Sequence, residues 1–292
     1  MDKEKIINAG KIASEAKKYA RTIIKKDVSL LEIAEKIEAK IEELGGKPAF
    51  PVNLSINEIA AHYTPAHDDE STAHGLLKVD LGVHIDGWVA DTAFSLDLEN
   101  NEENKKLIQI SGTALASGIK IAKENVLASE IGEAISDTIE SKGFSPVINL
   151  SGHSMEQYSL HAGITIPNTD DNRNIPLKEG LYAIEPFATP GNGKVHDGKP
   201  SGIYELRDNK NVRSPVAREV LEFIKKEYDT LPFCSRWIVK KIGNRALFGL
   251  RELEANGNLH NFPQLIETSK SKVSQSENTI LIEKDKVTVT TA

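Results

Sequence analysis

Isoleucines recur every four residues in two separate stretches of the chain. The first stretch is DVSLLEIAEKIEAKIEELGGKPAFPVNLS, and the second is NVLASEIGEAISDTIESKGFSPVINLS. Five positions match at one constant offset: Ile33, Ile37, Ile41, Gly45 and Pro48 in the first copy, and Ile131, Ile135, Ile139, Gly143 and Pro146 in the second. This spacing is typical of the buried side of a helix, and glycine after the last turn is a common C-cap. The sequence therefore contains a duplication built around one helix in each copy.

Each copy of the repeat has similar neighbours. An amphipathic stretch precedes each helix, at about residues 3–25 and 102–123, and the triplet NLS at 53–55 recurs at 149–151. An apolar segment, Leu77 to Leu96, follows the first copy, and GLYAIEPFAT follows the second. Helix pairs that alternate with strand pairs predict an α+β fold in which helices cover one face of a sheet. The duplication predicts a pseudo-two-fold axis, which places equivalent residues around a shared centre.

The pattern changes between residues 194 and 262, which have no counterpart in the first half. Helical patterns occur there at about Pro215 to Tyr228 and Arg245 to Asn256. We expect residues 194–262 to form an inserted helical subdomain, and residues 1–193 with 263–292 to form the main domain. The last segment, SENTILIEKDKVTVTTA, alternates and is rich in β-branched residues, which predicts a terminal strand pair.

The segment LKVDLGVHIDGWVADTAFSL carries two aspartates in an otherwise apolar hairpin. Asp86-Gly87 is a strong signal for a two-residue turn, and this turn pairs Asp80 with Ala93 and Gly82 with Asp91. Asp80 and Asp91 then lie diagonally on one face, with β-carbons about 7 Å apart. Two divalent metals roughly 3.5 to 4 Å apart would fit between them. The hairpin alone leaves a second interpretation open, in which one aspartate bonds within the hairpin and the other faces water.

Further candidate ligands occur in similar settings. His153 and His161 lie in NLSGHSMEQYSLHAG, Glu185 ends the apolar run AIE, and Glu277 lies in SQSENTILIE. Carboxylates with few histidines suit Mn, Fe(II), Co or Zn rather than a cysteine-based structural zinc. Taken singly, a loop histidine or a strand-end glutamate is more often ordinary polar surface.

The composition narrows the functional class. The 292 residues include 43 acidic and 36 basic side chains, and the net charge of -7 argues against a general nucleic-acid or membrane-surface binder. The start, MDKEKIINAG, has no apolar signal core, and no run approaches the ~18 apolar residues of a membrane span. The single cysteine, Cys234, cannot form an internal disulfide, and we expect it to be a packing residue. These features favour a cytoplasmic location.

Five motifs, in this order, resemble the type 2 methionine aminopeptidases of the pita-bread metallopeptidase family. They are FPVNLSINEIAAHYTP, DLGVHIDGWVADTA, NLSGHSMEQYSLHAG, AIEPFAT and LPFCSRW. The similarity runs along nearly the whole chain, and the lack of a charged N-terminal extension implies the archaeal form. The resemblance implies a curved, mostly antiparallel sheet with the duplicated helices packed on it. It also implies a helical, winged-helix-like insertion.

The resemblance implies five metal ligands and two divalent ions, which could be Co, Mn, Fe(II) or Zn. The ligands would be Asp80, Asp91, His153, Glu185 and Glu277. Asp91 and Glu277 would bridge the ions. The chain departs from the family at one place, because it has QSENT where members usually read QFEHT. Ser276 and Asn278 therefore replace an aromatic residue and a histidine, which puts the surroundings of Glu277 and the pocket wall in question.

The implied reaction removes the N-terminal methionine from nascent proteins when the second residue is small. A metal-bridged hydroxide would attack the scissile carbonyl, with Glu185 as proton carrier. His161 would hydrogen-bond the developing oxyanion, and His62 would position the substrate. Further candidates for substrate contacts are Phe50, Pro51, Leu160, Phe187 and His196, and plain core packing is the other interpretation of these residues. The resemblance implies a monomer with transient ribosome contact, and neither specific nucleic acid nor membrane as partner.

Two other functions fit the same fold. An Xaa-Pro peptidase would share the five ligands, but such enzymes commonly carry a large extra N-terminal domain and lack AHYTP. A non-enzymatic, ribosome- or RNA-associated homologue would have lost ligands, whereas all five positions are intact here.

Overall fold

The duplication takes the form of two helix pairs in the computed structural model, which describes residues 1–284 and 286–292. The first pair is α1 (Lys3–Ile23) and α2 (Leu30–Glu43), and the second is α3 (Glu102–Ile121) and α4 (Ala128–Glu140). In each copy a glycine at positive φ follows the second helix: Gly45, at 89°, follows α2, and Gly143, at 78°, follows α4. Glycine adopts this left-handed conformation without the steric cost of a β-carbon, so it terminates both helices.

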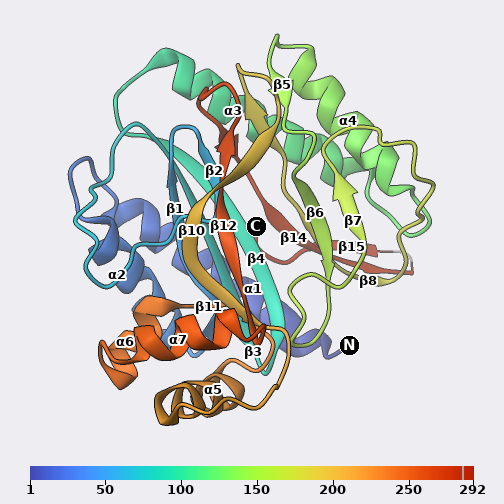
Figure 1. Ribbon diagram of the computed structural model, residues 1–292. Helices are drawn as coiled ribbons and strands as arrows, with labels where there is room; N and C mark the ends of the chain where they lie inside the picture. The colour runs from blue at the N-terminus through green and yellow to red at the C-terminus, as the bar shows by residue number, and fades with distance from the viewer. Residues whose placement is uncertain (285) are drawn as a thin grey trace.

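The strands of the described residues form four antiparallel sheets, which lie between the helices at the edges of the view (Figure 1). The first half contributes the sheet β1 (Lys47–Ile56), β3 (Leu76–Ile85) and β4 (Trp88–Asp97). The second half contributes the sheet β15 (Lys286–Val289), β14 (Asn278–Glu283), β8 (Gly180–Ile184), β6 (Ser151–Met155) and β7 (Thr165–Pro167). A small sheet joins β13 (Ser274–Gln275), β9 (Phe187–Thr189) and β5 (Ser145–Pro146). The pairing of β14 with β15 confirms the predicted terminal strand pair.

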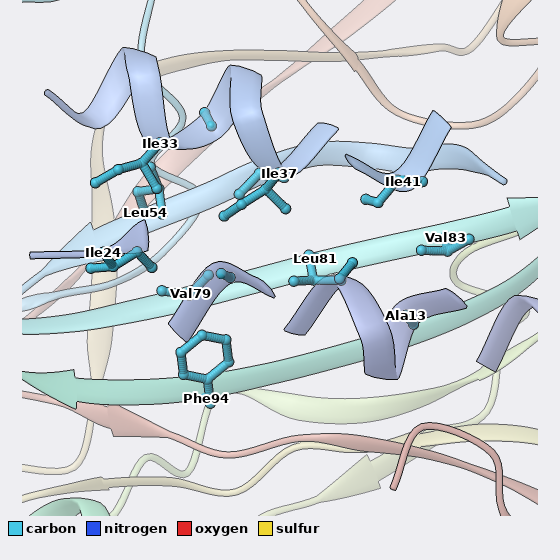
Figure 2. Packing of buried hydrophobic residues seen from close by; sticks show 14 of the residues in the cluster. Ala13, Ile24, Ile33, Ile37, Ile41, Leu54, Val79, Leu81, Val83 and Phe94 are labelled. Carbon is cyan, nitrogen blue, oxygen red and sulfur yellow. The ribbon is translucent and has the colours of Figure 1, made fainter. Parts of the chain in front are cut away.

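Each half has its own apolar core beneath its helix pair. Ile33, Ile37 and Ile41 are at most 1% exposed and lie in a row along one side of α2 (Figure 2). Their counterparts Ile131, Ile135 and Ile139 are equally buried under α4. Each such side chain contributes roughly 1.5–3 kcal/mol by leaving water, so the two isoleucine rows stabilise both halves alike. The predicted α+β fold with a duplicated, pseudo-two-fold arrangement is confirmed.

The segment expected to be an inserted subdomain contains three helices, which gather at the bottom of Figure 1. They are α5 (Pro215–Glu227), α6 (Ser235–Ile242) and α7 (Ala246–Ala255), and α6 was not predicted. They share a core of their own. Strands β10 (Val195–Leu206) and β12 (Leu259–Glu267) frame the helices, pair with each other and join β11 (Phe233–Cys234) and β2 (Ile59–Ala61) in one sheet. Since β12 crosses residue 262 and pairs with β2, the sheet of the insertion includes one strand of the first half.

No helix in the described part of the chain is both long and apolar enough to cross a membrane.

Candidate active site

The hairpin of β3 and β4 has the register that the sequence predicts. Asp80 pairs with Ala93 and Gly82 pairs with Asp91, across a turn in which Asp86 and Gly87 have φ of 48° and 81°. Positive φ at both turn residues is the requirement of a type I′ turn, which explains the Asp-Gly sequence. The two aspartates consequently lie on one face of the hairpin.

Five expected ligands line one cavity of about 330 Å³: Asp80, Asp91, His153, Glu185 and Glu277. His153 Nε2 lies 3.7 Å from Asp91 Oδ2 and 3.7 Å from Glu185 Oε1. One ligand atom from each of Asp91, His153 and Glu277 lies within 4.8 Å of the other two. The duplicated halves therefore bring side chains far apart in sequence to the shared centre.

Backbone hydrogen bonds between the halves fix this centre. Glu277 N donates to Ala93 O over 3.0 Å, and Ala93 N donates to Glu277 O over 3.4 Å. Glu277 lies between β13 and β14 of the second half, whereas Ala93 lies in β4 of the first. The position of Glu277 relative to Asp91 is thus set by main-chain pairing, and not by side-chain packing alone.

Asp91 and Glu277 are buried, and Asp80 and Glu185 are partly buried beside them. In the described residues, Asp80 Oδ1, Asp91 Oδ1 and both Glu277 carboxylate oxygens have no hydrogen-bond partner. Burial raises the pKa of Asp80 to about 7. Burial, with repulsion from neighbouring carboxylates, raises the pKa of Asp91, Glu185 and Glu277 well above the usual range. A buried carboxylate that lacks a partner is costly, so this donor set fits bound cations.

His153 is the neutral member of this candidate donor set. Burial, and then the adjacent His161 ring at a centroid distance of 4.4 Å, lower the pKa of His153 to about 3. Its imidazole is therefore uncharged near neutral pH, with a lone pair available to a metal. Oxygen and imidazole donors of this kind suit borderline first-row ions.

The two departures from the family motif lie outside the cavity lining. Glu277 lines the cavity, whereas the side chains of its two neighbours bond elsewhere. Ser276 Oγ lies 3.0 Å from Ser111 Oγ on α3. Asn278 Oδ1 accepts hydrogen bonds from Lys17 Nζ on α1 over 3.1 Å and from Thr291 Oγ1 over 3.0 Å. Among the residues described, neither Ser276 nor Asn278 lines the cavity, and both instead contact helices or strands around Glu277.

Lys17 lies behind the acidic centre and connects its two sides. Besides Asn278, its ammonium donates to Thr92 Oγ1 over 2.9 Å and to the Thr291 carbonyl over 2.8 Å. Thr92 directly follows Asp91, and Asn278 directly follows Glu277. Lys17 thus ties together the backbone segments that carry the two expected bridging ligands.

Three polar residues of the site were missed from the sequence. Gln275 Nε2 donates to Asp80 Oδ2 and Glu185 Oε2, each over 3.4 Å. Asn53 and Asn149 both line the cavity. The repeat itself was a signal for these two asparagines, because they are the first residues of the matching NLS triplets.

Both histidines expected near the substrate line the cavity. His62 has φ of 62°, a left-handed conformation that is uncommon outside glycine and often marks a functional site. Its Nδ1 lies 3.1 Å from the Pro263 carbonyl, which can only accept, so Nδ1 carries the proton. Burial lowers the pKa of His62. His161 is exposed within the cavity, beside His153.

Apolar side chains form the rest of the wall. Of the residues expected to contact substrate, Phe50, Leu160 and Phe187 line the cavity. The lining found among the described residues includes neither Pro51 nor His196. Pro51 is buried in β1, and His196 is exposed on β10, where it pairs with Ile266. The inserted segment instead contributes Ile203, Pro232 and Phe262.

Comparisons with known proteins identify the family. Residues 4–230 match the model of metallopeptidase family M24. The chain is 49% identical to a methionine aminopeptidase of Pyrococcus abyssi, with 100% of both chains covered. It is 45% identical to a methionine aminopeptidase of Methanocaldococcus jannaschii, with 99% of this chain and 98% of the relative covered.

Solved structures share the fold at low sequence identity. A thermophilic Arx1 matches with a TM-score of 0.83 at 14% identity, over 98% of this chain and 90% of that one. A methionine aminopeptidase of Thermotoga maritima matches with a TM-score of 0.70 at 21% identity, over 99% and 95%. The pita-bread fold is thereby confirmed. By its sequence and its fold, the chain belongs to metallopeptidase family M24.

Proposed function

We propose that this chain is a metal-dependent methionine aminopeptidase, which removes the N-terminal methionine of nascent proteins when the second residue is small. The observation that carries this proposal is the convergence of four carboxylates and one neutral histidine in a cavity with an apolar wall. The full-length relatives named methionine aminopeptidase support the same activity.

The five ligands would hold two divalent ions, with Asp91 and Glu277 shared between them. Co, Mn, Fe(II) and Zn all suit these donors. Such ions lower the pKa of the water that they bind and polarise a carbonyl oxygen. Asp80 would hold one ion, and His153 and Glu185 would hold the other.

The side chains around the acidic centre divide the remaining work. Glu185 Oε2 accepts from Gln275, which leaves Oε1 to take a proton from the attacking water and to deliver it to the leaving amine. His161 donates to the substrate carbonyl oxygen as negative charge develops there. His62, oriented by the Pro263 carbonyl, positions the substrate backbone through its free Nε2.

The apolar wall supports methionine as the side chain that is bound. Phe50, Leu160 and Phe187 come from the two halves, and Ile203, Pro232 and Phe262 come from the inserted segment. Together they provide an apolar slot next to the metal ligands. An unbranched thioether fits irregular apolar space well, and its sulfur packs favourably against aromatic rings.

We infer that the chain acts as a monomer in the cytoplasm on polypeptides that are leaving the ribosome. Transient ribosome contact stays a prediction. The alternative function is a peptidase specific for Xaa-Pro bonds, and a comparison of substrates distinguishes it from a methionine aminopeptidase.

The test is cleavage of Met-Ala-Ser and of a set of Xaa-Pro peptides by purified protein reconstituted with each ion. We expect cleavage of Met-Ala-Ser only, and its loss in Asp91→Ala and Glu277→Ala. Metal content measured by elemental analysis should fall in both variants. Full activity in either variant would contradict the bridging role, and preferential cleavage of Xaa-Pro peptides would contradict the proposed substrate.

A further inference from the structure

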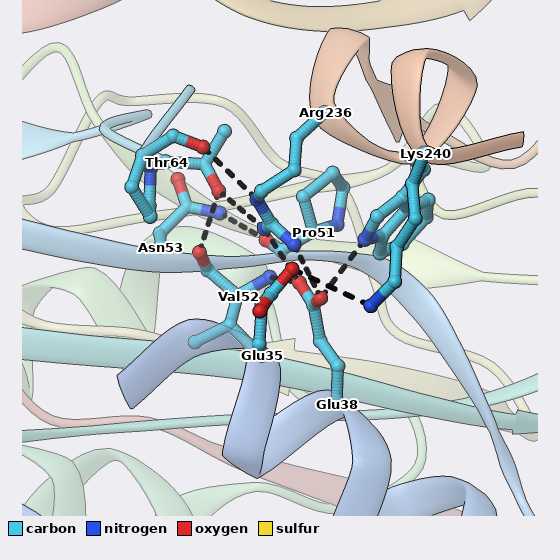
Figure 3. Close-up of polar contacts among 10 residues, drawn as sticks. Glu35, Glu38, Pro51, Val52, Asn53, Thr64, Arg236 and Lys240 are labelled. Atoms are coloured by element: carbon cyan, nitrogen blue, oxygen red, sulfur yellow. Dashed lines mark hydrogen bonds and ion pairs between the residues drawn. The ribbon is translucent and has the colours of Figure 1, made fainter. Parts of the chain in front are cut away.

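A buried ion pair connects the inserted segment to the first half. Arg236 of α6 is 2% exposed and Glu38 of α2 is 7% exposed. Arg236 Nη1 donates to Glu38 Oε2 over 2.6 Å, and Nη2 donates to Glu38 Oε1 over 2.8 Å. Figure 3 shows the two side chains meeting between α6 and α2. Two parallel hydrogen bonds fix the angle as well as the distance between the partners.

The pair also binds two segments of main chain. Glu38 Oε1 accepts from Val52 N over 3.2 Å. Arg236 Nε donates to the Pro65 carbonyl over 3.0 Å, and Nη2 donates to Thr64 Oγ1 over 3.3 Å. The Thr64 hydroxyl in turn donates to the Val52 carbonyl over 2.9 Å (Figure 3). One guanidinium group therefore holds β1, the segment after β2 and helix α6 together.

Each of these segments carries part of the cavity wall. Phe50 lies two residues before Val52, and His62 lies two residues before Thr64. Pro232 lies four residues before Arg236. The ion pair itself does not line this cavity among the described residues, so its influence on substrate passes through the wall residues that it orients.

We propose that Arg236 is a positioning residue for the substrate pocket, which sets the fit of the pocket to the side chain of the N-terminal residue through Glu38, Thr64 and Pro65. A buried ion pair commonly adds little net stability compared with an apolar pair, whereas its planar geometry specifies orientation. This inference rests on the proposed aminopeptidase function and adds a determinant of its substrate selectivity.

The readout is the ratio of kcat/KM for Met-Ala-Ser to kcat/KM for Leu-Ala-Ser. Loss of folded or metal-loaded protein lowers both values equally and leaves their ratio unchanged. A changed pocket shape alters the ratio, because apolar pockets distinguish similar side chains by roughly 10- to 200-fold. We expect the ratio to fall by about tenfold in Arg236→Met, a change in discrimination of about 1.4 kcal/mol.

Two further variants distinguish a change in the pocket from misfolding of the protein. Glu38→Gln combined with Arg236→Met removes both charges, so that no unpaired charge is buried, and we expect the same fall in the ratio. The matched control is Lys240→Met. Lys240 Nζ lies 3.4 Å from Glu35 Oε1, linking the same two helices one turn away (Figure 3). This pair is exposed, and neither partner lines the substrate cavity in the described structure, so the ratio should equal that of the wild type.

Added guanidinium supplies a test by restoration. A second cavity, of about 400 Å³, reaches both Glu38 and Arg236 and gives a small ion access to the position of the missing side chain. In Arg236→Ala, millimolar guanidinium should restore the ratio toward the wild-type value, and urea should not. Guanidinium should leave the ratio of Lys240→Met unchanged.

The outcomes separate this inference from the proposed function. No cleavage of Met-Ala-Ser by the reconstituted wild type overturns the function and the positioning role together. Cleavage by the wild type with an unchanged ratio in Arg236→Met and in the double variant overturns the positioning role alone.

Discussion

The hydroxyl group of Thr279 and the backbone of Asp91 are joined by two hydrogen bonds. Asp91 N donates to Thr279 Oγ1 over 2.8 Å, and the same hydroxyl donates to the Asp91 carbonyl over 2.8 Å. Thr279 belongs to β14 of the second half and is fully buried. The Thr279 side chain of the second half therefore bonds both backbone polar groups of Asp91, a candidate bridging ligand in the first half.

Thr279→Val should destabilise the protein and weaken metal binding. The substitution keeps the shape but leaves the buried Asp91 N–H and carbonyl without partners, which costs about 1–3 kcal/mol of unfolding free energy. Loss of an orienting contact commonly weakens metal binding about 10- to 100-fold. Urea unfolding and metal titration calorimetry measure the two effects.

Thr288→Val is the matched control, because the Thr288 hydroxyl is buried without a partner in the described structure. Its unfolding free energy should stay within about 0.5 kcal/mol of the wild type. Equal effects of the two substitutions would show that the hydrogen bonds of Thr279 contribute nothing.

Asn278→Ala should reduce metal affinity, whereas Ser276→Ala should not. Without Asn278 Oδ1, the Lys17 ammonium and the Thr291 hydroxyl each lose an acceptor close to both expected bridging ligands. We expect a loss of about 1–3 kcal/mol in unfolding free energy for Asn278→Ala. Ser276→Ala removes a single contact with Ser111 of α3, which in the described residues is not joined to the segment of Asp91, and should keep wild-type affinity. Calorimetric titration of both variants with one metal ion measures the two affinities. A weaker affinity in Ser276→Ala than in Asn278→Ala would contradict the proposed role of Asn278.

His161→Ala should lower turnover while metal content stays near that of the wild type. The proposed contact of His161 with the developing oxyanion exists only in the transition state, so its loss should reduce kcat by about 10²- to 10³-fold. Steady-state kinetics and elemental analysis of one preparation provide both numbers. A variant that loses its metal would place His161 among the ligands instead.

His84 should make stability depend on pH in the weakly acidic range. Burial lowers the pKa of His84 to about 4, and its Nδ1 accepts a hydrogen bond from Gly87 N over 3.1 Å, which requires the neutral ring. Because the unfolded chain binds a proton near pH 6.5 and the folded chain does not, stability is lost as the pH falls from about 6.5 to about 4. The loss can reach about 3 kcal/mol.

His84→Gln supplies the comparison, since glutamine does not titrate. The unfolding free energy of the wild type minus that of His84→Gln should decrease as the pH falls through this range. A difference that is constant with pH would show that His84 does not titrate differently in the two states.

Local sequence patterns were enough to predict part of the candidate site. The Asp86-Gly87 turn and the strand alternation around it were enough to place Asp80 and Asp91 on one face, because hairpin register is a local property. The isoleucine repeat predicted one helix in each copy, because helical periodicity is also a local property. The gathering of His153, Glu185 and Glu277 came from the family resemblance, since no local pattern states which distant strands will meet.

The features that sequence reasoning missed depend on contacts that are distant in sequence. Strand β12 extends across the expected domain boundary and pairs with β2, which lies far earlier in the sequence. No local pattern in either segment predicts this pairing. His196 alternates outward from β10, a direction fixed by its pairing with Ile266. The helix α6 is short, and its amphipathic pattern spans too few residues to stand out.

The position of Glu277 also sets the order in which the site is completed during synthesis. During synthesis, Asp80, Asp91, His153 and Glu185 emerge from the ribosome well before Glu277 does. The backbone of Glu277 then pairs with Ala93. Until that pairing forms, the growing chain lacks one of the two residues that would be shared between the ions. Metal loading is therefore expected to be the closing event of biogenesis, and a chain that stalls before β14 would fold its first half without acquiring a working centre.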